Sequence, residues 1–328
     1  MVLGEKIQEM PHDQLLLTTV IDTFLETLQS DSTIRAYRRA VQSFLLEIEL
    51  DRSALSDLFQ IKYEVLCSKA LTFLSKRQRI DQFSKEVLNP RSINLNRYAL
   101  SSFFQFLQNR YKFPHNPVSH LKKLKVPDKS NTPPLTEHQA LKILQILKED
   151  AHRNEVKQRD FLIVLGLFLL ALRRKEVANL RWDQIIFDQN LVRLNQKGSK
   201  ERVIPVPKPY LDMLLAFREQ YQTQCPYVFR PVKNNRTKVV SKPISPDYIY
   251  YLVKRVASTV VPEKRITPHS FRTSFVTLAF NWGEDPKAIL HGTGHGSYEM
   301  LMYYHMGEVL TINAIHTMGK YLSAHDII

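Results

Sequence analysis

The amino-acid sequence predicts a mainly α-helical protein of two domains, with a small antiparallel sheet in the second domain. Three observations favour this fold class. The 328 residues exceed the usual size of one hydrophobic core. Apolar residues recur at helical spacing along most of the chain. Residues 119–134 form a polar, lysine-rich stretch with prolines, which predicts a linker between two folded parts.

Residues 1–118 are predicted to form an all-helical domain of four or so helices. Apolar side chains at helical spacing fill residues 18–48, and the Ser-Asp-Ser-Thr sequence at 30–33 supplies a turn and a helix cap, so a helical hairpin is expected. Further helical stretches are predicted over about 57–77 and 91–111.

Residues 135–328 are predicted to form the second domain, which opens with helices. Thr136 can cap a helix that runs to about Lys148. The apolar run Phe161–Leu172 has 12 residues, too few to span the roughly 30 Å of a bilayer core. It is therefore expected to be a buried helix.

A small sheet and several further helices are predicted to follow. Strand character at residues 185–194 and 202–206, joined by a glycine-containing turn, predicts an antiparallel hairpin. Helical patterns then occur at about 209–221, 245–258, 268–281, 285–291 and 298–306.

The charge of the chain favours a polyanionic partner. The sequence has 46 Lys and Arg against 32 Asp and Glu, a net charge of +14, which suits nucleic acid or an anionic membrane surface. The net charge is −4 over residues 1–50, +9 over 51–130 and +9 over the remaining 198 residues. Two basic bodies could grip one polyanion from two sides, and a generally basic surface that aids solubility is an equally favoured alternative.

Cysteine content and the N-terminal sequence bear on location. Cys67 and Cys225 are the only cysteines, which excludes a disulfide framework and indicates a reducing compartment. The first residues do not have the basic and apolar regions of a signal peptide. A cytoplasmic protein without a membrane partner is expected.

The segment Thr267-Pro268-His269-Ser-Phe-Arg272 predicts a phosphate-binding helix start. Thr267 can cap the helix and Pro268 fits its first turn, and the spacing places His269 and Arg272 on one face. A cation and an imidazole at a helix N-terminus suit a phosphate. By itself the segment is more often a surface histidine beside a salt-bridged arginine.

Arg173 follows the apolar run and can form a clamp with a second arginine. Two arginines can donate paired hydrogen bonds to phosphate oxygens and stabilise a pentacoordinate transition state. Glu176 is expected to orient Arg173 through an i, i+3 salt bridge. By itself the basic sequence at 173–175 would be better explained as a helix end that complements the helix dipole.

A lysine and a tyrosine complete the predicted chemistry. Lys197, at the tip of the predicted hairpin, can protonate a leaving oxygen, and Lys200 competes with it for this role. The alternative for Lys197 is a solvated lysine in a turn, which is common. A short helix would bring His295 and one of the tyrosines Tyr303 and Tyr304 to the same site, where positive charge favours the nucleophilic phenolate.

No metal or other cofactor is expected. The sequence has no GxxxxGK[ST] loop and no acidic metal cluster, and an ester to tyrosine conserves the bond energy needed for resealing. A rival interpretation takes His291, His295 and His305 as zinc ligands, but the glycines at 292 and 294 weaken a helical His-x-x-x-His pair.

These motifs, in their order along the chain, resemble those of the tyrosine recombinase (phage integrase) family, which includes Xer-type resolvases and integrases of phages and plasmids. Residues 171–182 resemble its first arginine box, residues 196–202 its lysine hairpin, His269-x-x-Arg272 its second box and Thr293-Gly-His295 its Leu-Gly-His box. The resemblance implies the catalytic residues Arg173, Lys197, His269, Arg272, His295 and Tyr304, supported by Glu176.

The resemblance also implies an architecture and an activity. Residues 1–118 would be a core-binding (SAM-like) domain, and residues 135–328 a catalytic domain with a C-terminal tail. The protein would cleave and rejoin double-stranded DNA at inverted-repeat sites through a 3′-phosphotyrosyl intermediate, as a tetramer on two sites in the nucleoid, with accessory proteins as further partners. The tail at 309–328 would dock on a neighbouring protomer.

The sequence departs from the family pattern at three places. Thr273 replaces a frequent histidine or polar residue, and Thr293 replaces a leucine, with an expected effect on packing more than on chemistry. The family's Tyr-x-His ending fits Tyr303, whereas the nine-residue distance from His295 fits Tyr304, and distance constrains the chemistry more. A type IB topoisomerase and a non-catalytic DNA-binding accessory protein are the alternative functions.

Overall fold

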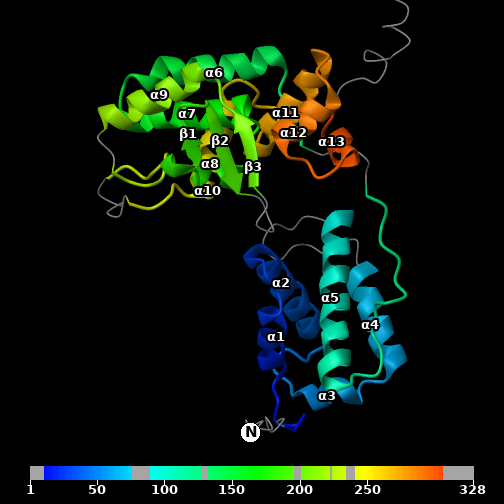
Figure 1. Cartoon of the computed structure of the whole chain (residues 1–328). Coiled ribbons are helices and arrows are strands. Elements are labelled where there is room, and N and C mark those ends of the chain that lie inside the picture. The colour runs from blue at the N-terminus through cyan, green and yellow to red at the C-terminus, as the bar shows by residue number, and fades with distance from the viewer. Residues whose placement is uncertain are drawn as a thin grey trace, which may run out of the picture. The chain divides into compact units, whose positions relative to one another are not determined.

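In the computed structural model the chain forms two compact units: unit 1, residues 1–127, and unit 2, residues 128–328 (Figure 1). The residues that the structure describes are 11–75, 89–126, 132–195, 201–221, 224–233 and 241–305. None of the helices in these ranges is long and apolar enough to cross a membrane.

Unit 1 is helical, as predicted. Its described helices are α1 (Leu17–Glu26), α2 (Asp31–Glu47), α3 (Leu55–Gln60), α4 (Tyr63–Ser75) and α5 (Pro90–Tyr111). The helical hairpin is confirmed as α1 and α2. The prediction of one continuous helix over about 57–77 is wrong, because Ile61 has an extended backbone conformation and separates α3 from α4. The break lets Leu58 of α3 and Leu66 of α4 enter the same core.

Helix α5 is the central element of unit 1. Its N-terminus is capped by Asn89, whose side chain accepts a hydrogen bond from the Ser92 N–H at 3.0 Å, and Pro90 occupies the first turn. Aromatic rings of α5 meet rings of α1 and α2 edge to face in the core. The Asn94 side chain donates a hydrogen bond to the Leu124 carbonyl at 2.9 Å and accepts one from the Leu124 N–H at 2.8 Å. The first part of the predicted linker therefore lies along α5.

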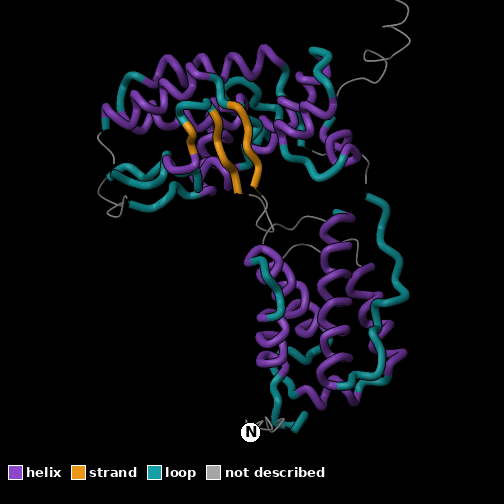
Figure 2. Tube along the Cα trace, in the orientation of Figure 1, coloured by secondary structure: helices purple, strands orange, loops and turns teal. Residues whose placement is uncertain are grey.

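Unit 2 is mostly helical around one small sheet (Figure 2). Its described elements are α6 (Glu137–Ala151), α7 (Glu155–Leu169), α8 (Arg174–Ala178), the 3-10 helix η1 (Trp182–Gln184), β1 (Ile185–Ile186), β2 (Leu191–Asn195), β3 (Glu201–Pro205), α9 (Lys208–Gln220), α10 (Pro246–Ala257), α11 (Pro268–Asn281), α12 (Pro286–Thr293) and α13 (Tyr298–Tyr304). The predicted capping of α6 is confirmed, since the Thr136 hydroxyl oxygen accepts a hydrogen bond from the Gln139 N–H at 3.2 Å.

The sheet is antiparallel with strand order β1-β2-β3. The strand predicted over 185–194 is split into β1 and β2, because the chain turns between them and Asn190 takes a left-handed φ of 55°. Across β2 and β3, Leu194 pairs with Arg202. The buried helix predicted from the apolar run is α7, which packs against α6, α9 and α11 and ends at Leu169, three residues before the run does.

Gly166 on α7 is a position where packing outweighs helix propensity. An Ala Cβ there would lie 2.5 Å from the hydroxyl oxygen of Tyr210, whose side chain is buried and donates a 2.9 Å hydrogen bond to the Leu162 carbonyl. Gly→Ala in a helix normally stabilises by about 1 kcal/mol. We expect Gly166→Ala instead to lower the free energy of unfolding by about 1–3 kcal/mol through overpacking.

The hydroxyl provides the control for this prediction. In a Tyr210→Phe background the nearest remaining ring atom would lie 3.4 Å from the added Cβ, an ordinary contact. The same Gly166→Ala change should then be neutral or stabilising. Urea unfolding of the four proteins measures both effects, and equal destabilisation in the two backgrounds would contradict the packing explanation.

Candidate active site

Unit 2 gathers five of the six predicted catalytic side chains from four places in the chain. These are Arg173 directly before α8, His269 and Arg272 in the first turns of α11, His295 after α12 and Tyr304 at the end of α13. Helix α11 contacts both α12 and α13. The sixth residue, Lys197, and its competitor Lys200 lie outside the described residues.

Local sequence determines where α11 begins. Pro268 occupies the first helical turn, and the Thr267 N–H donates a hydrogen bond to the Ser270 hydroxyl oxygen at 3.0 Å. Thr267 is the N-cap residue, as predicted. The helix starts where predicted, and His269 and Arg272 lie one turn apart.

Arg272 is the most buried charged side chain of the site, with 1% of its surface exposed. It donates hydrogen bonds to the carbonyl oxygens of Ala171, at 2.6 Å, and Thr293. Ala171 has a left-handed φ of 48°, a conformation that costs a non-glycine residue roughly 1 kcal/mol or more. Burial and the nearby Arg173 lower the pKa of Arg272 to about 9, so the guanidinium is still charged at neutral pH.

Arg173 is held from two sides and remains partly open to solvent, with 41% of its side chain exposed. Its Nη1 pairs with Glu176 Oε1 at 2.7 Å, and its backbone N–H donates to Glu176 Oε2 at 2.7 Å. The expected i, i+3 salt bridge is therefore present. Nη2 donates to the Gly294 carbonyl at 3.0 Å.

A third arginine, which the sequence motifs did not single out, completes this arrangement. Arg202 on β3 donates a 2.9 Å hydrogen bond to the Gly292 carbonyl and pairs with Glu176 at 3.2 Å. The carbonyls of residues 292, 293 and 294 thus each accept a hydrogen bond from a different arginine. They form the turn that leads into His295, and Gly294 takes the left-handed φ of 64° that this turn requires.

Hydrogen bonds define the tautomer of His295. The Thr293 hydroxyl donates to the Ile289 carbonyl at 2.7 Å, so it accepts the 2.7 Å hydrogen bond from His295 Nδ1. Nε2, without a proton, then faces Arg272 Nη2 at 3.3 Å as an acceptor. Thr293 therefore makes a polar contact that the sequence did not indicate, because its hydroxyl holds the imidazole of His295.

Both histidines are neutral at pH 7. Burial, followed by repulsion from Arg272 and then Arg173, lowers the pKa of His269 to about 4 and that of His295 to about 3. Among the described residues of the site, three guanidinium groups face the one carboxylate of Glu176, an excess of two positive charges that suits an anion.

The lowered histidine pKa values predict a pH dependence of stability. Between the unfolded value of about 6.5 and the folded values, the unfolded chain binds more protons than the folded chain. We therefore expect the free energy of unfolding of the DNA-free protein to fall as the pH is lowered from 6.5 towards 4, by at most about 1.4 kcal/mol per pH unit and histidine.

Fluorescence can follow this unfolding, since both tryptophans of the chain, Trp182 and Trp282, belong to unit 2. His295→Asn should flatten the dependence of stability on pH, and His291→Asn, at an exposed position, should not. A His295→Asn protein with the same pH dependence as the unmodified chain would show that this histidine does not titrate as described.

The two candidate nucleophiles differ in their surroundings. The Tyr304 ring lies between the site histidines, with centroid distances of 4.9 Å to His269, edge to face, and 4.9 Å to His295, nearly stacked. The hydroxyl oxygen of Tyr303 is shielded from solvent. Of the two, Tyr304 is the ring in contact with both imidazoles.

The residues proposed for the rival zinc site can also be located. His291 is exposed on α12, His295 is buried in the network above, and His305 is buried against the Phe280 ring, with centroids 4.5 Å apart. Within the described ranges no three His, Cys, Asp or Glu side chains are grouped so as to hold a metal ion.

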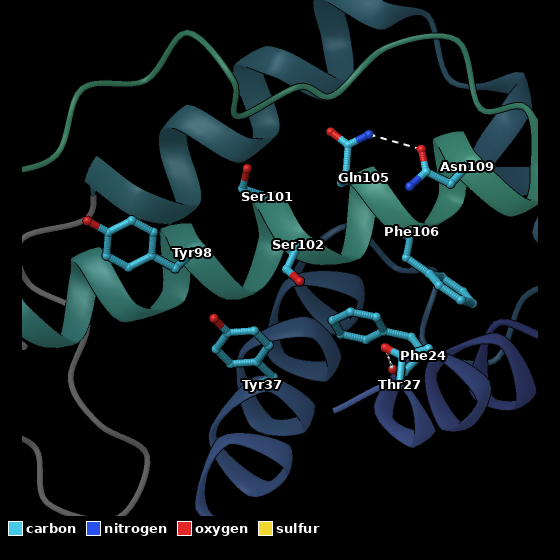
Figure 3. A pocket seen from close by; sticks show the side chains of 9 residues that line it. All are labelled: Phe24, Thr27, Tyr37, Tyr98, Ser101, Ser102, Gln105, Phe106 and Asn109. Carbon is cyan, nitrogen blue, oxygen red and sulfur yellow. Dashed lines mark hydrogen bonds between the residues drawn. The ribbon is translucent and has the colours of Figure 1, made fainter. Parts of the chain in front are cut away.

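Unit 1 has an open pocket of about 610 Å³ between α1, α2 and α5 (Figure 3). Its lining residues are Phe24, Thr27, Tyr37, Tyr98, Ser101, Ser102, Gln105, Phe106 and Asn109. Hydroxyl and amide groups at helical spacing on α5 line one wall, and Gln105 donates a 3.1 Å hydrogen bond to Asn109. Such groups can hydrogen-bond a polar ligand.

The fold of this chain is similar to the folds of solved integrase structures. The Tn1549 transposon integrase in complex with a circular intermediate DNA superposes with a TM-score of 0.64 at 16% identity, over 94% of this chain and 100% of that one. A lambda integrase dimer bound to a COC′ core site gives 0.63 at 17% identity, over 88% and 77%. The chain shares their fold.

Comparison with protein sequences establishes the relationship. Residues 133–308 match the model of the phage integrase family. The tyrosine recombinase XerA of Thermococcus onnurineus is 31% identical over 74% of this chain and 77% of its own length. XerA of Pyrococcus furiosus is 28% identical over 89% and 91%. The chain belongs to the phage integrase family of tyrosine recombinases.

Proposed function

We propose that this protein is a site-specific DNA recombinase that cleaves one strand by attack of Tyr304 on a phosphate and rejoins it to a partner strand. The observation that carries the proposal is the position of the Tyr304 ring against His269 and His295, beside two guanidinium groups. Arg272 and Tyr304 also interact electrostatically. A nucleophile and an anion receptor are thus adjacent.

A phosphate would satisfy hydrogen-bonding groups that the described residues leave open. The Nε–H of Arg272 is buried and has no hydrogen-bond partner among those residues. Arg173 uses Nη1 and Nη2 within the protein but presents its exposed edge to solvent. The two arginines would bind non-bridging oxygens and stabilise the additional charge of the pentacoordinate transition state.

The proposed cleavage forms one phosphate ester bond and breaks another. The Tyr304 oxygen bonds to phosphorus and the bond from phosphorus to the 5′ oxygen breaks. The neutral His269, whose ring nitrogens have no hydrogen bond to the described residues, accepts the tyrosine proton. Lys197 protonates the departing 5′ oxygen, a role assigned by resemblance. The product is a 3′-phosphotyrosyl ester, and a 5′ hydroxyl from a partner duplex reverses the step.

Exchange of strands between two sites would need a tetramer on double-stranded DNA. Membership of the family supports this assembly, and the integrases compared above are described in complexes with DNA. We further propose residues 1–118 as the core-binding domain, residues 119–134 as linker and residues 135–328 as the catalytic domain. The tail at 309–328, outside the described residues, would dock on a neighbouring protomer.

Trapping the covalent intermediate tests the proposal. The substrates are duplexes with inverted repeats from the DNA that flanks the gene, each nicked so that the cleaved fragment is lost and the adduct accumulates. We expect an adduct that resists denaturation, with the nucleotide mapped by mass spectrometry to Tyr304. Absence of any adduct on substrates that the protein binds would contradict the proposal and favour a non-catalytic DNA-binding protein.

A further inference from the structure

Arg202 occupies a strand position where an apolar side chain is expected. Side chains of β3 alternate between exposed and buried, and Arg202 shares the buried face with Ile204. Only 4% of its side chain is exposed, and burial lowers its pKa. A buried cation costs free energy unless charged or polar partners compensate it.

The partners of Arg202 belong to the two segments that carry Arg173 and His295. Nη2 pairs with Glu176 Oε2 at 3.2 Å, the oxygen that also accepts the Arg173 backbone N–H. Nη1 donates to the Gly292 carbonyl at 2.9 Å, three residues before His295. One planar guanidinium thus connects α8 with the end of α12.

Arg202 is the second residue of β3, the return strand of the hairpin. Its neighbour Glu201 pairs with Asn195 across β2 and β3, so residues 196–200, which include Lys197, join these two paired strands. The hairpin, α8 and the turn after α12 are far apart in sequence. Arg202 is the residue on β3 that hydrogen-bonds to both of the other segments.

We propose that Arg202 is a positioning residue for strand cleavage, which fixes Glu176, and through it Arg173, and the turn before His295 without contacting the phosphate. The role rests on the proposed function, since it concerns the same reaction. Glu176 keeps Arg173 as a partner when Arg202 is lost, so the fold does not depend on the ion pair with Arg202 alone. Removing one partner of a buried ion pair is destabilising when it leaves the other charge uncompensated, and here Arg173 still compensates Glu176.

Removal of this guanidinium should therefore slow cleavage more than it affects DNA binding. A displacement of catalytic groups by about 1 Å can cost on the order of 100-fold in rate. In single-turnover cleavage of the nicked substrate at saturating protein, we expect Arg202→Met to lower the rate constant by about 10- to 100-fold. The protein concentration at half-saturation should change by less than about threefold. Arg202→Lys keeps the charge but cannot bridge both partners, so its rate should lie in between.

Arg193→Met is the matched control. Arg193 lies on β2, exposed on the opposite face of the same hairpin, and its loss removes the same charge. Its cleavage rate constant should remain within about threefold of that of the unmodified protein. A variant that only has fewer folded molecules yields less adduct at an unchanged rate constant, which separates a positioning role from a structural one.

A double-mutant cycle completes the test. If Arg202 acts through Glu176, the Arg202→Met and Glu176→Gln losses should be non-additive, with the double variant within about threefold of the slower single variant. An unchanged rate constant in Arg202→Met, or losses that multiply, would overturn the inference. Adduct formation by the unmodified protein in the same assay separates this outcome from a failure of the proposed function, in which no protein forms adduct.

Discussion

Tyr304→Phe should abolish the covalent protein–DNA adduct while leaving DNA binding unchanged. The substitution removes the proposed nucleophilic oxygen but keeps the ring that packs between His269 and His295. Loss of a catalytic nucleophile commonly costs at least about 10⁴-fold in rate. Gel electrophoresis under denaturing conditions measures the adduct on the nicked duplex, and a mobility shift measures binding.

Tyr303→Phe is the matched control and also tests the competing nucleophile. It removes one hydroxyl group from the neighbouring ring, whose centroid lies 5.1 Å from that of Tyr304. We expect adduct to form with this variant. Adduct formation by Tyr304→Phe together with its loss in Tyr303→Phe would reverse the assignment, and the Tyr-x-His pattern would then outweigh the distance from His295.

The starts of the site helices could be predicted because local signals determine them. Pro268 begins α11, and the i, i+3 spacing alone makes His269 and Arg272 neighbours. In unit 1, by contrast, no glycine or proline marks the break at Ile61, which follows from how α3 and α4 share one core. Helical periodicity alone could not indicate this break.

The contacts that complete the site could not be predicted, since they join distant segments. Alternation along β3 would have placed Arg202 on the buried face with Ile204, but not beside Glu176 or Gly292. The role of Thr293 depends on a helix C-terminus that turns its hydroxyl towards His295. Sequence motifs identified groups that can do the chemistry, whereas the hydrogen bonds that orient them depend on tertiary structure.

Arg272→Lys should reduce the cleavage rate constant by on the order of 10³-fold or more. The guanidinium donates to the carbonyls of Ala171 and Thr293 and still has a buried Nε–H for a phosphate oxygen. An ammonium is a single point of positive charge and cannot serve these three directions at once. Each hydrogen bond to a charged group contributes about 1.5–3 kcal/mol, so loss of two accounts for an effect of this size.

An Arg→Lys substitution at an exposed position is the control, because it makes the same change of charge distribution and side-chain volume away from the site. Arg265 lies on the surface shortly before α11, and Arg265→Lys should cleave at nearly the rate of the unmodified protein. Circular dichroism determines the folded fraction of Arg272→Lys, so that its rate constant can be assigned to folded molecules. A folded Arg272→Lys protein that cleaves within tenfold of the unmodified rate would mean that charge alone suffices, and that the directions in which Arg272 donates its hydrogen bonds do not matter for catalysis.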